Sequence, residues 1–299
     1  MNLRMTPLFA ESWSVAYRLK PPGSILTDHQ TPFILIPNSS RYWAADPMVF
    51  EHEGRTYIFA ELYDYARFRG IIGVTEFDGR HFGEWTPVLE EDSHMSYPFV
   101  FRQGDEIYMM PENRNGRCLN VYRAVEFPYR WERYRLVLKD VEWVDTTILP
   151  EGDGYIGFTE SMAQPITDYR FRMDRDFTVT DCRPIAQSGD NVHRCGGPMF
   201  RYSGKLIRVT QDCVEDYGRA LYFRCCDPQT LAEEFVQRLT PEQLNFDRKL
   251  FLQGMHTYSS SGDFEVIDVK TRRLTPRHFY HRFTGRIRRL LETHLPFHT

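Results

Sequence analysis

Two aspartates and one histidine, Asp46, Asp145 and His256, stand at matching points of similar sequence segments. Carboxylates that converge on one pocket repel each other, which raises the pKa of some of them. Chemistry at a glycosidic bond uses such a set, with one carboxylate as base or nucleophile and one protonated group as acid. An Asp at the start of a strand often only caps a turn. The repetition of these residues in register therefore favours a reactive site over three unrelated caps.

Further polar residues fall at equivalent points of the segments that follow. The residues we predict to be catalytic are Asp46, Asp145, Glu112 and Glu160. Those we predict to bind the substrate are Glu61, Tyr97, His193, Arg194, Gln211, Asp212, His256 and Trp43. Of the aromatic residues near the funnel, Trp43, Tyr97, Trp143 and Tyr258 could stack on sugar faces, but for most of them core packing between blades is the favoured explanation.

Arg194 has two interpretations. Its guanidinium, with His193 beside it, could stabilise a phosphate leaving group, as in transfer from a nucleotide sugar. Asp46 would then be the base that accepts a proton from the acceptor hydroxyl. Alternatively, Arg194 forms an ion pair with Asp46, Asp145 or a glutamate and only neutralises an acidic pocket.

The elements that carry these residues repeat along the chain. Each copy is a short apolar run, a polar turn with Gly, and a run of alternating apolar residues, which is typical of a β-hairpin. The points Asp46, Tyr97, Asp145, Gly197 and His256 are separated by 51, 48, 52 and 59 residues. Repeats of this length that contain several strands predict the blades of a propeller. We therefore expect an all-β, five-bladed β-propeller whose innermost strands bring these residues together in one acidic funnel.

The propeller should span residues 10–268. The alternating run 13–19 is expected to complete the last blade and so remove its open edge. Residues 228–252 suggest a partly helical insertion before the fifth copy. Residues 269–299 suggest a basic amphipathic helix, with Phe279, Phe283 and Ile287 on one stripe. This helix could bind an anionic membrane surface, or dock on the propeller or a partner.

Composition narrows the class of protein. The 299 residues are 41% apolar and 15% aromatic, so the chain can bury a large core. No apolar run is long enough to span a membrane, and the first residues lack the pattern of a secretory signal. We therefore expect a cytoplasmic protein, peripheral at the inner face of the membrane if the tail binds lipid. The net charge is −4, and residues 270–299 carry +7, so the remainder carries −11. An acidic body argues against a nucleic-acid ligand.

These motifs resemble two related groups of proteins. The first comprises five-bladed propeller glycosidases of the arabinanase, xylosidase, levansucrase and invertase type. That resemblance implies Asp46 as base or nucleophile, Asp145 as a residue that tunes its pKa, and His256 near a central metal or water. A divalent metal at His256 near the propeller axis is thus a candidate cofactor. In the glycosidases, the general acid is a Glu in the segment that here reads His193-Arg194-Cys195. In this chain, Glu112, Glu160 or Asp212 would have to replace that acid.

The second group is more similar. Ala45-Asp46-Pro47, residues 96–101, Met110-Pro111-Glu112, Val144-Asp145-Thr146, residues 211–213 and Tyr217-Gly218 resemble a bacterial family homologous to the N-terminal domain of glucosamine inositolphosphorylceramide transferases. This resemblance implies a carbohydrate-active enzyme in glycosyl transfer during surface-glycan assembly, with a carbohydrate or nucleotide-sugar substrate. Two alternatives stay open. One is a glycoside hydrolase with a relocated acid, and the other is a non-catalytic glycan-binding module.

Overall fold

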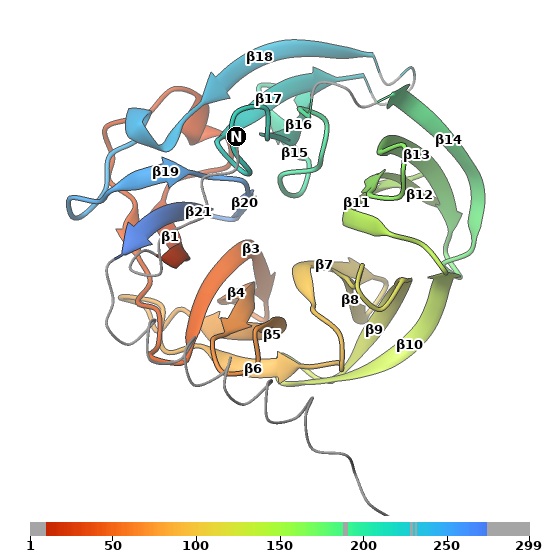
Figure 1. Ribbon diagram of the computed structural model, residues 1–299, viewed down its shortest axis with the longest axis horizontal. Coiled ribbons are helices and arrows are strands. Elements are labelled where there is room, and N and C mark those ends of the chain that lie inside the picture. The colour runs from red at the N-terminus through yellow and green to blue at the C-terminus, as the bar shows by residue number, and fades with distance from the viewer. Residues whose placement is uncertain (1–9, 188–190, 228–229, 231, 274–299) are drawn as a thin grey trace, which may run out of the picture.

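The computed structural model describes residues 10–187, 191–227, 230 and 232–273. In this part of the chain the strands form five sheets that are arranged like blades around a central axis (Figure 1). The predicted all-β, five-bladed propeller is therefore confirmed. The first strand of each of blades 1 to 4 lies nearest the axis, so the matching segments of the sequence face one another across the centre (Figure 1).

Blades 1 to 4 follow one another along the chain as four-stranded antiparallel sheets. Blade 1 contains β3 (Tyr42–His52), β4 (Arg55–Asp64), β5 (Arg69–Glu76) and β6 (Thr86–Leu89). Blade 2 contains β7 (Ser96–Gln103), β8 (Glu106–Glu112), β9 (Cys118–Glu126) and β10 (Arg130–Lys139). Blade 3 contains β11 (Trp143–Glu151), β12 (Gly154–Ser161), β13 (Thr167–Asp174) and β14 (Val179–Gln187). Blade 4 contains β15 (Phe200–Tyr202), β16 (Lys205–Asp212), β17 (Ala220–Cys226) and β18 (Glu233–Leu239).

Blade 5 joins the two ends of the propeller. It contains β19 (Leu252–Gly254), β20 (Tyr258–Ser261), β21 (Phe264–Arg273), β1 (Ala10–Leu19) and β2 (Ile34–Leu35). β1 pairs with β21 along its whole length, from Ala10 opposite Arg273 to Leu19 opposite Phe264. The predicted closure of the ring by the N-terminal strand is confirmed, and it removes the open edge that β21 would otherwise present.

A buried ion pair links the two strands that close the ring. Nε of Arg18 in β1 donates to Oε2 of Glu265 in β21 at 2.8 Å, and both side chains are almost completely buried. The other carboxylate oxygen accepts the Tyr258 hydroxyl at 2.7 Å and the Ile25 N–H at 2.9 Å. Ile25 belongs to the short 3₁₀ turn η1 (Ser24–Leu26), so the pair also fixes the connection between β1 and β2.

The innermost strands of blades 1 to 3 share an irregularity that aims their polar residues at the axis. Asp46, Tyr97 and Asp145 all have positive φ, between 45° and 53°. Each lies where the pairing register shifts between the first and second strands of its blade. Such a bulge turns a side chain out of the normal alternation of the sheet. The sequence alignment of these three residues is thus an alignment of equivalent backbone positions.

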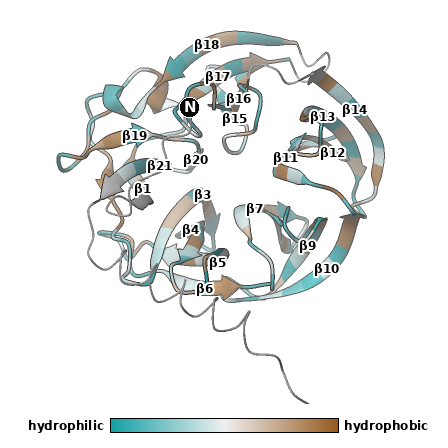
Figure 2. Cartoon of the chain, in the orientation of Figure 1, coloured by the Kyte–Doolittle hydropathy of each residue, from teal (hydrophilic) through white to brown (hydrophobic). Residues whose placement is uncertain are grey.

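Apolar residues pack between the blades and hold them at fixed spacing. Hydrophobic positions occur in strands of every blade (Figure 2). One buried cluster extends over blades 1 to 3 and contains Phe59, Tyr97, Met110 and Phe158. Because the faces of neighbouring blades share this core, the polar ends of the inner strands keep a fixed geometry.

One predicted segment has a different structure from the prediction, and a second lies outside the residues that the structure describes. Over 228–252, where a partly helical insertion was expected, the described residues form strand β18 and only a short 3₁₀ turn, η2 (Pro241–Gln243). The branched and aromatic run Phe235–Val236 belongs to a fourth strand rather than a helix. β21 continues to Arg273, and the helix expected within 269–299 falls on residues 274–299, outside the described residues. In the described part, no helix has the length and apolar character needed to cross a membrane.

Candidate active site

Asp46 is the central carboxylate of the candidate site. It lies in the bulge of β3 and is 4% exposed. Its Oδ1 accepts the Thr257 hydroxyl at 2.9 Å, and its Oδ2 accepts the backbone N–H of Tyr97 at 3.2 Å. Its own N–H donates to Oδ2 of Asp268 at 2.9 Å. Hydrogen bonds from blades 2 and 5 therefore fix this side chain of blade 1.

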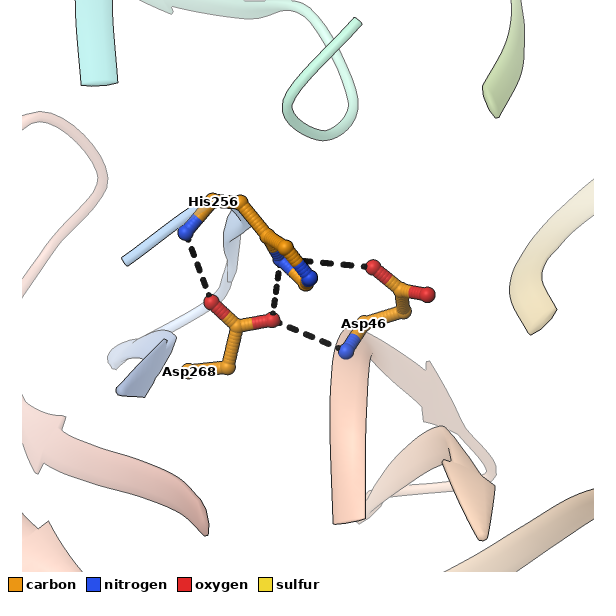
Figure 3. Close-up of side chains that lie close together, drawn as sticks. All are labelled: Asp46, His256 and Asp268. Carbon is orange, nitrogen blue, oxygen red and sulfur yellow. Dashed lines mark hydrogen bonds and ion pairs between the residues drawn. The ribbon is translucent and has the colours of Figure 1, made fainter. Parts of the chain in front are cut away.

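Asp268, in the middle of β21, links Asp46 to His256 (Figure 3). Its Oδ1 accepts the backbone N–H groups of His256 and Thr257 at 2.9 and 3.0 Å. Its Oδ2 lies 2.7 Å from Nδ1 of His256. Asp268 is not among the site residues predicted from the sequence. A single acid inside the apolar run Val266-Ile267-Asp268-Val269 is the signal that could have identified it, since a buried carboxylate needs partners.

The surroundings of Asp46 and His256 shift the pKa values of both side chains. Burial raises the pKa of Asp46 to about 6, with His256 opposing that shift and Asp145 and Asp268 adding to it. Burial alone would lower the pKa of His256, but the carboxylates of Asp268 and Asp46 outweigh it and the pKa is raised. His256 also stacks on the Trp13 ring, with centroids 3.9 Å apart. A carboxyl with a pKa near 6 can serve as a base at neutral pH.

Asp46, His256 and Asp268 are also the one group among the described residues whose geometry could suit a metal ion. One atom from each lies within 4.8 Å of the others. However, protein N–H and O–H groups already bond to all four oxygens of the two carboxylates, and Nδ1 of His256 faces Oδ2 of Asp268 at 2.7 Å. The cluster thus satisfies its own hydrogen-bonding needs. The residues therefore do not fit a resident cation.

Asp145, at the equivalent bulge of blade 3, is the second buried aspartate, 2% exposed. Its Oδ2 accepts Nε of Arg194 and Nε2 of Gln211, the latter at 2.7 Å. Its backbone N–H donates to Oε2 of Glu112 at 3.3 Å. A terminal nitrogen of Arg194 lies 3.6 Å from that same oxygen of Glu112. The ion pair between Arg194 and Asp145, one of the two interpretations of this arginine, is therefore present.

Three buried glutamates near the ends of second strands complete the acidic cluster. Burial raises the pKa of Glu160 to about 7, with Arg194 opposing and Asp168 and Asp145 adding. Burial, followed by neighbouring carboxylates, raises the pKa values of Glu61 and Glu112 well above the usual range. These three residues pair with Ala45, Ser96 and Val144, each next to a bulge residue. Equivalent positions of blades 1 to 3 thus supply one carboxyl each.

Glu61 has a neighbour that the sequence analysis did not identify. Nε2 of His94 lies 3.4 Å from Oε1 of Glu61. Nδ1 of His94 accepts the backbone N–H of Gly70 at 2.8 Å, and burial lowers the pKa of this ring. The neutral ring must therefore carry its proton on Nε2, the nitrogen that faces Glu61.

Several predicted binding residues have structural partners instead. Tyr97 is fully buried, and its hydroxyl contacts Thr147 Oγ1 at 2.7 Å and accepts the Gly197 N–H at 2.8 Å. It therefore supports the centre of the propeller and has no free group for a ligand. Gln211 is fully buried and positions Asp145.

The other predicted binding residues lie at or beyond the edge of the cluster. Asp212 bonds to Nε of Arg238 at 2.7 Å within blade 4. The Trp43 ring stacks on Tyr63, with centroids 4.7 Å apart. The backbone carbonyl of His193 accepts a hydrogen bond from Arg208 at 2.7 Å, which fixes the segment next to Arg194. None of these contacts brings Asp212 or Trp43 to Asp46.

Comparisons with known proteins identify a family and related sequences. The family model described as glucosamine inositolphosphorylceramide transferase 1, N-terminal, matches residues 36–237, which include nearly all of blades 1 to 4. Glucosamine inositolphosphorylceramide transferase 1 from Arabidopsis thaliana is 33% identical over 218 residues. That match covers 69% of this chain but 28% of the relative, so the chain spans little more than a quarter of that protein's length.

Solved structures share the fold at low sequence identity. The catalytic domain of the GH62 α-L-arabinofuranosidase from Coprinopsis cinerea has a TM-score of 0.61 and 13% identity, over 90% of this chain and 98% of that one. A GH43 enzyme from Xanthomonas citri has a TM-score of 0.56 and 11% identity, over 79% and 88%. These likenesses show the propeller fold alone. By the match to its family model, this chain belongs to the family of glucosamine inositolphosphorylceramide transferase 1 N-terminal domains.

Proposed function

We propose that this chain is a carbohydrate-active protein that takes part in glycosyl transfer through its acidic funnel. The observation that supports this most directly is the pair of buried aspartates, Asp46 and Asp145, on equivalent bulges of blades 1 and 3. One is bound to His256 and Asp268, and the other to Arg194 and Gln211. The two carboxylates thus occupy equivalent backbone positions but have different environments. Such a difference allows the two groups to take different chemical roles in one site.

In the reaction that we propose, Asp46 is the base. It takes the proton of the acceptor hydroxyl while the acceptor oxygen forms a bond to the anomeric carbon of the donor sugar. The bond from that carbon to the donor phosphate breaks, and the electron pair leaves with the phosphate oxygen. Arg194 is 16% exposed and uses its Nε for Asp145, which leaves guanidinium N–H groups to meet the negative charge.

The sugar that we propose is an amino sugar of the glucosamine type. The names of the related proteins state glucosamine. The funnel supports the choice, because four buried carboxyl groups, Asp46, Asp145, Glu160 and Asp268, outnumber the cations Arg194 and His256 even when Glu61 and Glu112, whose pKa values are raised well above the usual range, are protonated. Such a surface attracts a ligand with a positively charged amino group.

A thermal-shift experiment tests this proposal. The wild type and Asp46→Asn would be screened with nucleotide sugars, free nucleotides, glucosamine and neutral oligosaccharides, since a bound ligand raises the melting temperature. Stabilisation of the wild type by a nucleotide sugar and its nucleotide, together with turnover that Asp46→Asn loses, would support transfer. A wild type that none of the sugars stabilises would contradict the proposal.

One observation favours a second candidate, a glycoside hydrolase with a relocated acid. Glu160 is buried, has a pKa of about 7 and lies within the field of Asp145 and Arg194. A carboxyl that is half protonated near neutral pH can protonate a leaving alcohol, which an arginine cannot do. Release of reducing sugar from a neutral oligosaccharide, abolished by Glu160→Gln, would favour hydrolysis over transfer.

A further inference from the structure

The loop of residues 213–218 connects β16 and β17 at the edge of the acidic cluster. Its residues Val214, Glu215, Asp216 and Tyr217 are all exposed, and two of them are apolar or aromatic. Val214 is 60% exposed and Tyr217 is 41% exposed. An aromatic side chain that stays open to solvent next to buried catalytic candidates needs an explanation, because burial of such a ring normally stabilises a fold.

Three residues of the candidate site hold the Tyr217 ring without covering it. The ring makes an edge contact with His256, with centroids 5.3 Å apart, and another with Trp13 at 6.2 Å. The guanidinium carbon of Arg194 lies 5.4 Å from the ring centroid, at cation–π distance. The ring therefore contacts both His256 of the Asp46–His256 cluster and Arg194 of the Asp145–Arg194 pair.

The loop itself is anchored, so the ring has a defined position. Nζ of Lys270, which is 4% exposed, donates to Oδ2 of Asp216 at 2.9 Å and to the Tyr217 carbonyl at 3.1 Å. Gly218 has a φ of 62°, and a Cβ there would come within 2.9 Å of both Trp13 and His256. Only glycine allows the loop to approach the cluster this closely.

We propose that Tyr217 is a binding residue that stacks on the face of a pyranose ring held over Asp46 and Arg194. A sugar has one face of C–H groups and edges of hydroxyl groups. An open aromatic ring suits that face, while carboxylates accept hydrogen bonds from the hydroxyls. The charged neighbours favour a sugar over a nucleobase, because carboxylates accept from O–H groups but offer little that matches the mixed edge of a base. This proposal rests on the proposed function only in that the funnel must bind a carbohydrate.

The test compares Tyr217→Ala and Tyr217→Trp with the wild type. Tyr134→Ala is the matched control, because Tyr134 is 49% exposed but lies on β10, the outermost strand of blade 2. Calorimetric titrations would use glucosamine, xylotriose and uridine diphosphate as probes. We expect Tyr217→Ala to weaken binding of the sugar that the wild type binds by about tenfold, which is about 1.4 kcal/mol. Tyr217→Trp should retain binding, and Tyr134→Ala should leave it unchanged.

The outcomes separate the two proposals. If Asp46→Asn weakens sugar binding and Tyr217→Ala does not, the funnel binds the sugar but the stacking proposal is wrong. If Tyr217→Ala weakens uridine diphosphate alone, the ring serves a nucleobase, which also overturns the proposal. If the wild type binds neither sugar, both proposals fail. Melting temperatures of the variants would show that a loss of binding is not a loss of folding.

Discussion

Nδ1 of His256 lies 2.7 Å from Oδ2 of Asp268, and both side chains are almost completely buried. The same carboxylate accepts the N–H of Asp46, the candidate base. Asp268 thus connects blade 5 to blade 1 at the point where the ring closes, and it also sets the charge around Asp46. A residue with both roles should show its loss in stability and in pH dependence.

We expect Asp268→Asn to destabilise the protein by about 3–5 kcal/mol, the usual cost of breaking a buried ion pair. The pKa of His256 is raised in the folded protein, so its protonation stabilises the fold below about pH 6.5, the ordinary histidine value, and this contribution disappears as the pH rises through the raised pKa. The penalty of the variant should therefore be larger at pH 6 than at an alkaline pH above the raised pKa of His256, measured by urea denaturation. Asp181→Asn, at a more exposed pair, is the control. Equal penalties at both values would argue against a charged His256.

The difference in unfolding free energy between the wild type and Asp46→Asn should depend on pH, because folding raises the pKa of Asp46. Its pKa rises from 3.8 to about 6 on folding, so the folded protein binds more protons than the unfolded chain between these values. Wild-type stability therefore falls as the pH rises from about 4 to about 6. The asparagine variant should gain up to about 3 kcal/mol relative to the wild type from pH 4 to pH 7. Melting curves at several pH values test this, and a constant difference between the two proteins would refute it.

If the chain is instead a glycoside hydrolase with Asp46 as the base and Glu160 as the acid, its pH profile should be narrow. Asp46 must be ionised, with a pKa of about 6, and Glu160 must be protonated, with a pKa of about 7. Turnover should therefore peak between these values. Glu160→Gln should lower the rate by roughly 10²–10⁴-fold and remove the alkaline limb. Glu132→Gln, on the exposed face of β10, should change neither. A rate that stays constant above pH 8 would exclude Glu160 as the acid.

The fold and the equivalent positions of Asp46, Tyr97 and Asp145 could be predicted from the sequence, because both depend on patterns that repeat along the chain. Asp46, Tyr97 and Asp145 were aligned by type and spacing, and all three have positive φ in equivalent bulges. The run 13–19 was recognised as a closing strand by its alternation alone, and its pairing with β21 confirms this. In each case, the signal is a short sequence pattern, either repeated at a regular spacing along the chain or contained in the strand itself.

Contacts between residues of different blades could not be predicted from the sequence. Nothing local indicates that Asp268 contacts Asp46, 222 residues away, or that the Tyr97 hydroxyl contacts Thr147 and Gly197. For the same reason, Tyr97 was expected to bind a ligand although it is fully buried. Such contacts are set by how the five blades pack, and that depends on the whole core.

Arg208 should be essential to the position of Arg194. It is 3% exposed, donates to Glu233 at 2.7 Å, and bonds to the His193 carbonyl. Arg208→Leu leaves the carboxylate of Glu233, whose side chain is 17% exposed, with Arg224 at 3.8 Å as its remaining cation and should cost about 1–3 kcal/mol. The double variant Arg208→Leu/Glu233→Leu should recover much of this loss, because no buried charge remains. Chemical denaturation of the two single variants and the double variant forms the cycle, and simple additivity would contradict a buried pair.

Alanine variants of Gly197 and Gly54 test whether the segment that leads into β15 of blade 4 must lie close to blade 5. Gly197 and Gly54 both have positive φ, 132° and 74°, but a Cβ on Gly197 would come within 1.9 Å of the Tyr258 carbonyl oxygen, while one on Gly54 meets nothing within 4 Å. Gly54→Ala should therefore cost only the backbone strain of a left-handed residue, about 1–2 kcal/mol.

Gly197→Ala should cost more than Gly54→Ala, because two backbones must separate. This movement also breaks the hydrogen bond from the Gly197 N–H to the Tyr97 hydroxyl at the centre of the propeller. Both variants add a methyl group to a positive-φ glycine, so the difference between their unfolding free energies contains the contact between the blades together with the greater backbone strain of alanine at a φ of 132°. Equal losses would mean that blades 4 and 5 can move apart at the axis without cost, and that the site does not depend on their spacing.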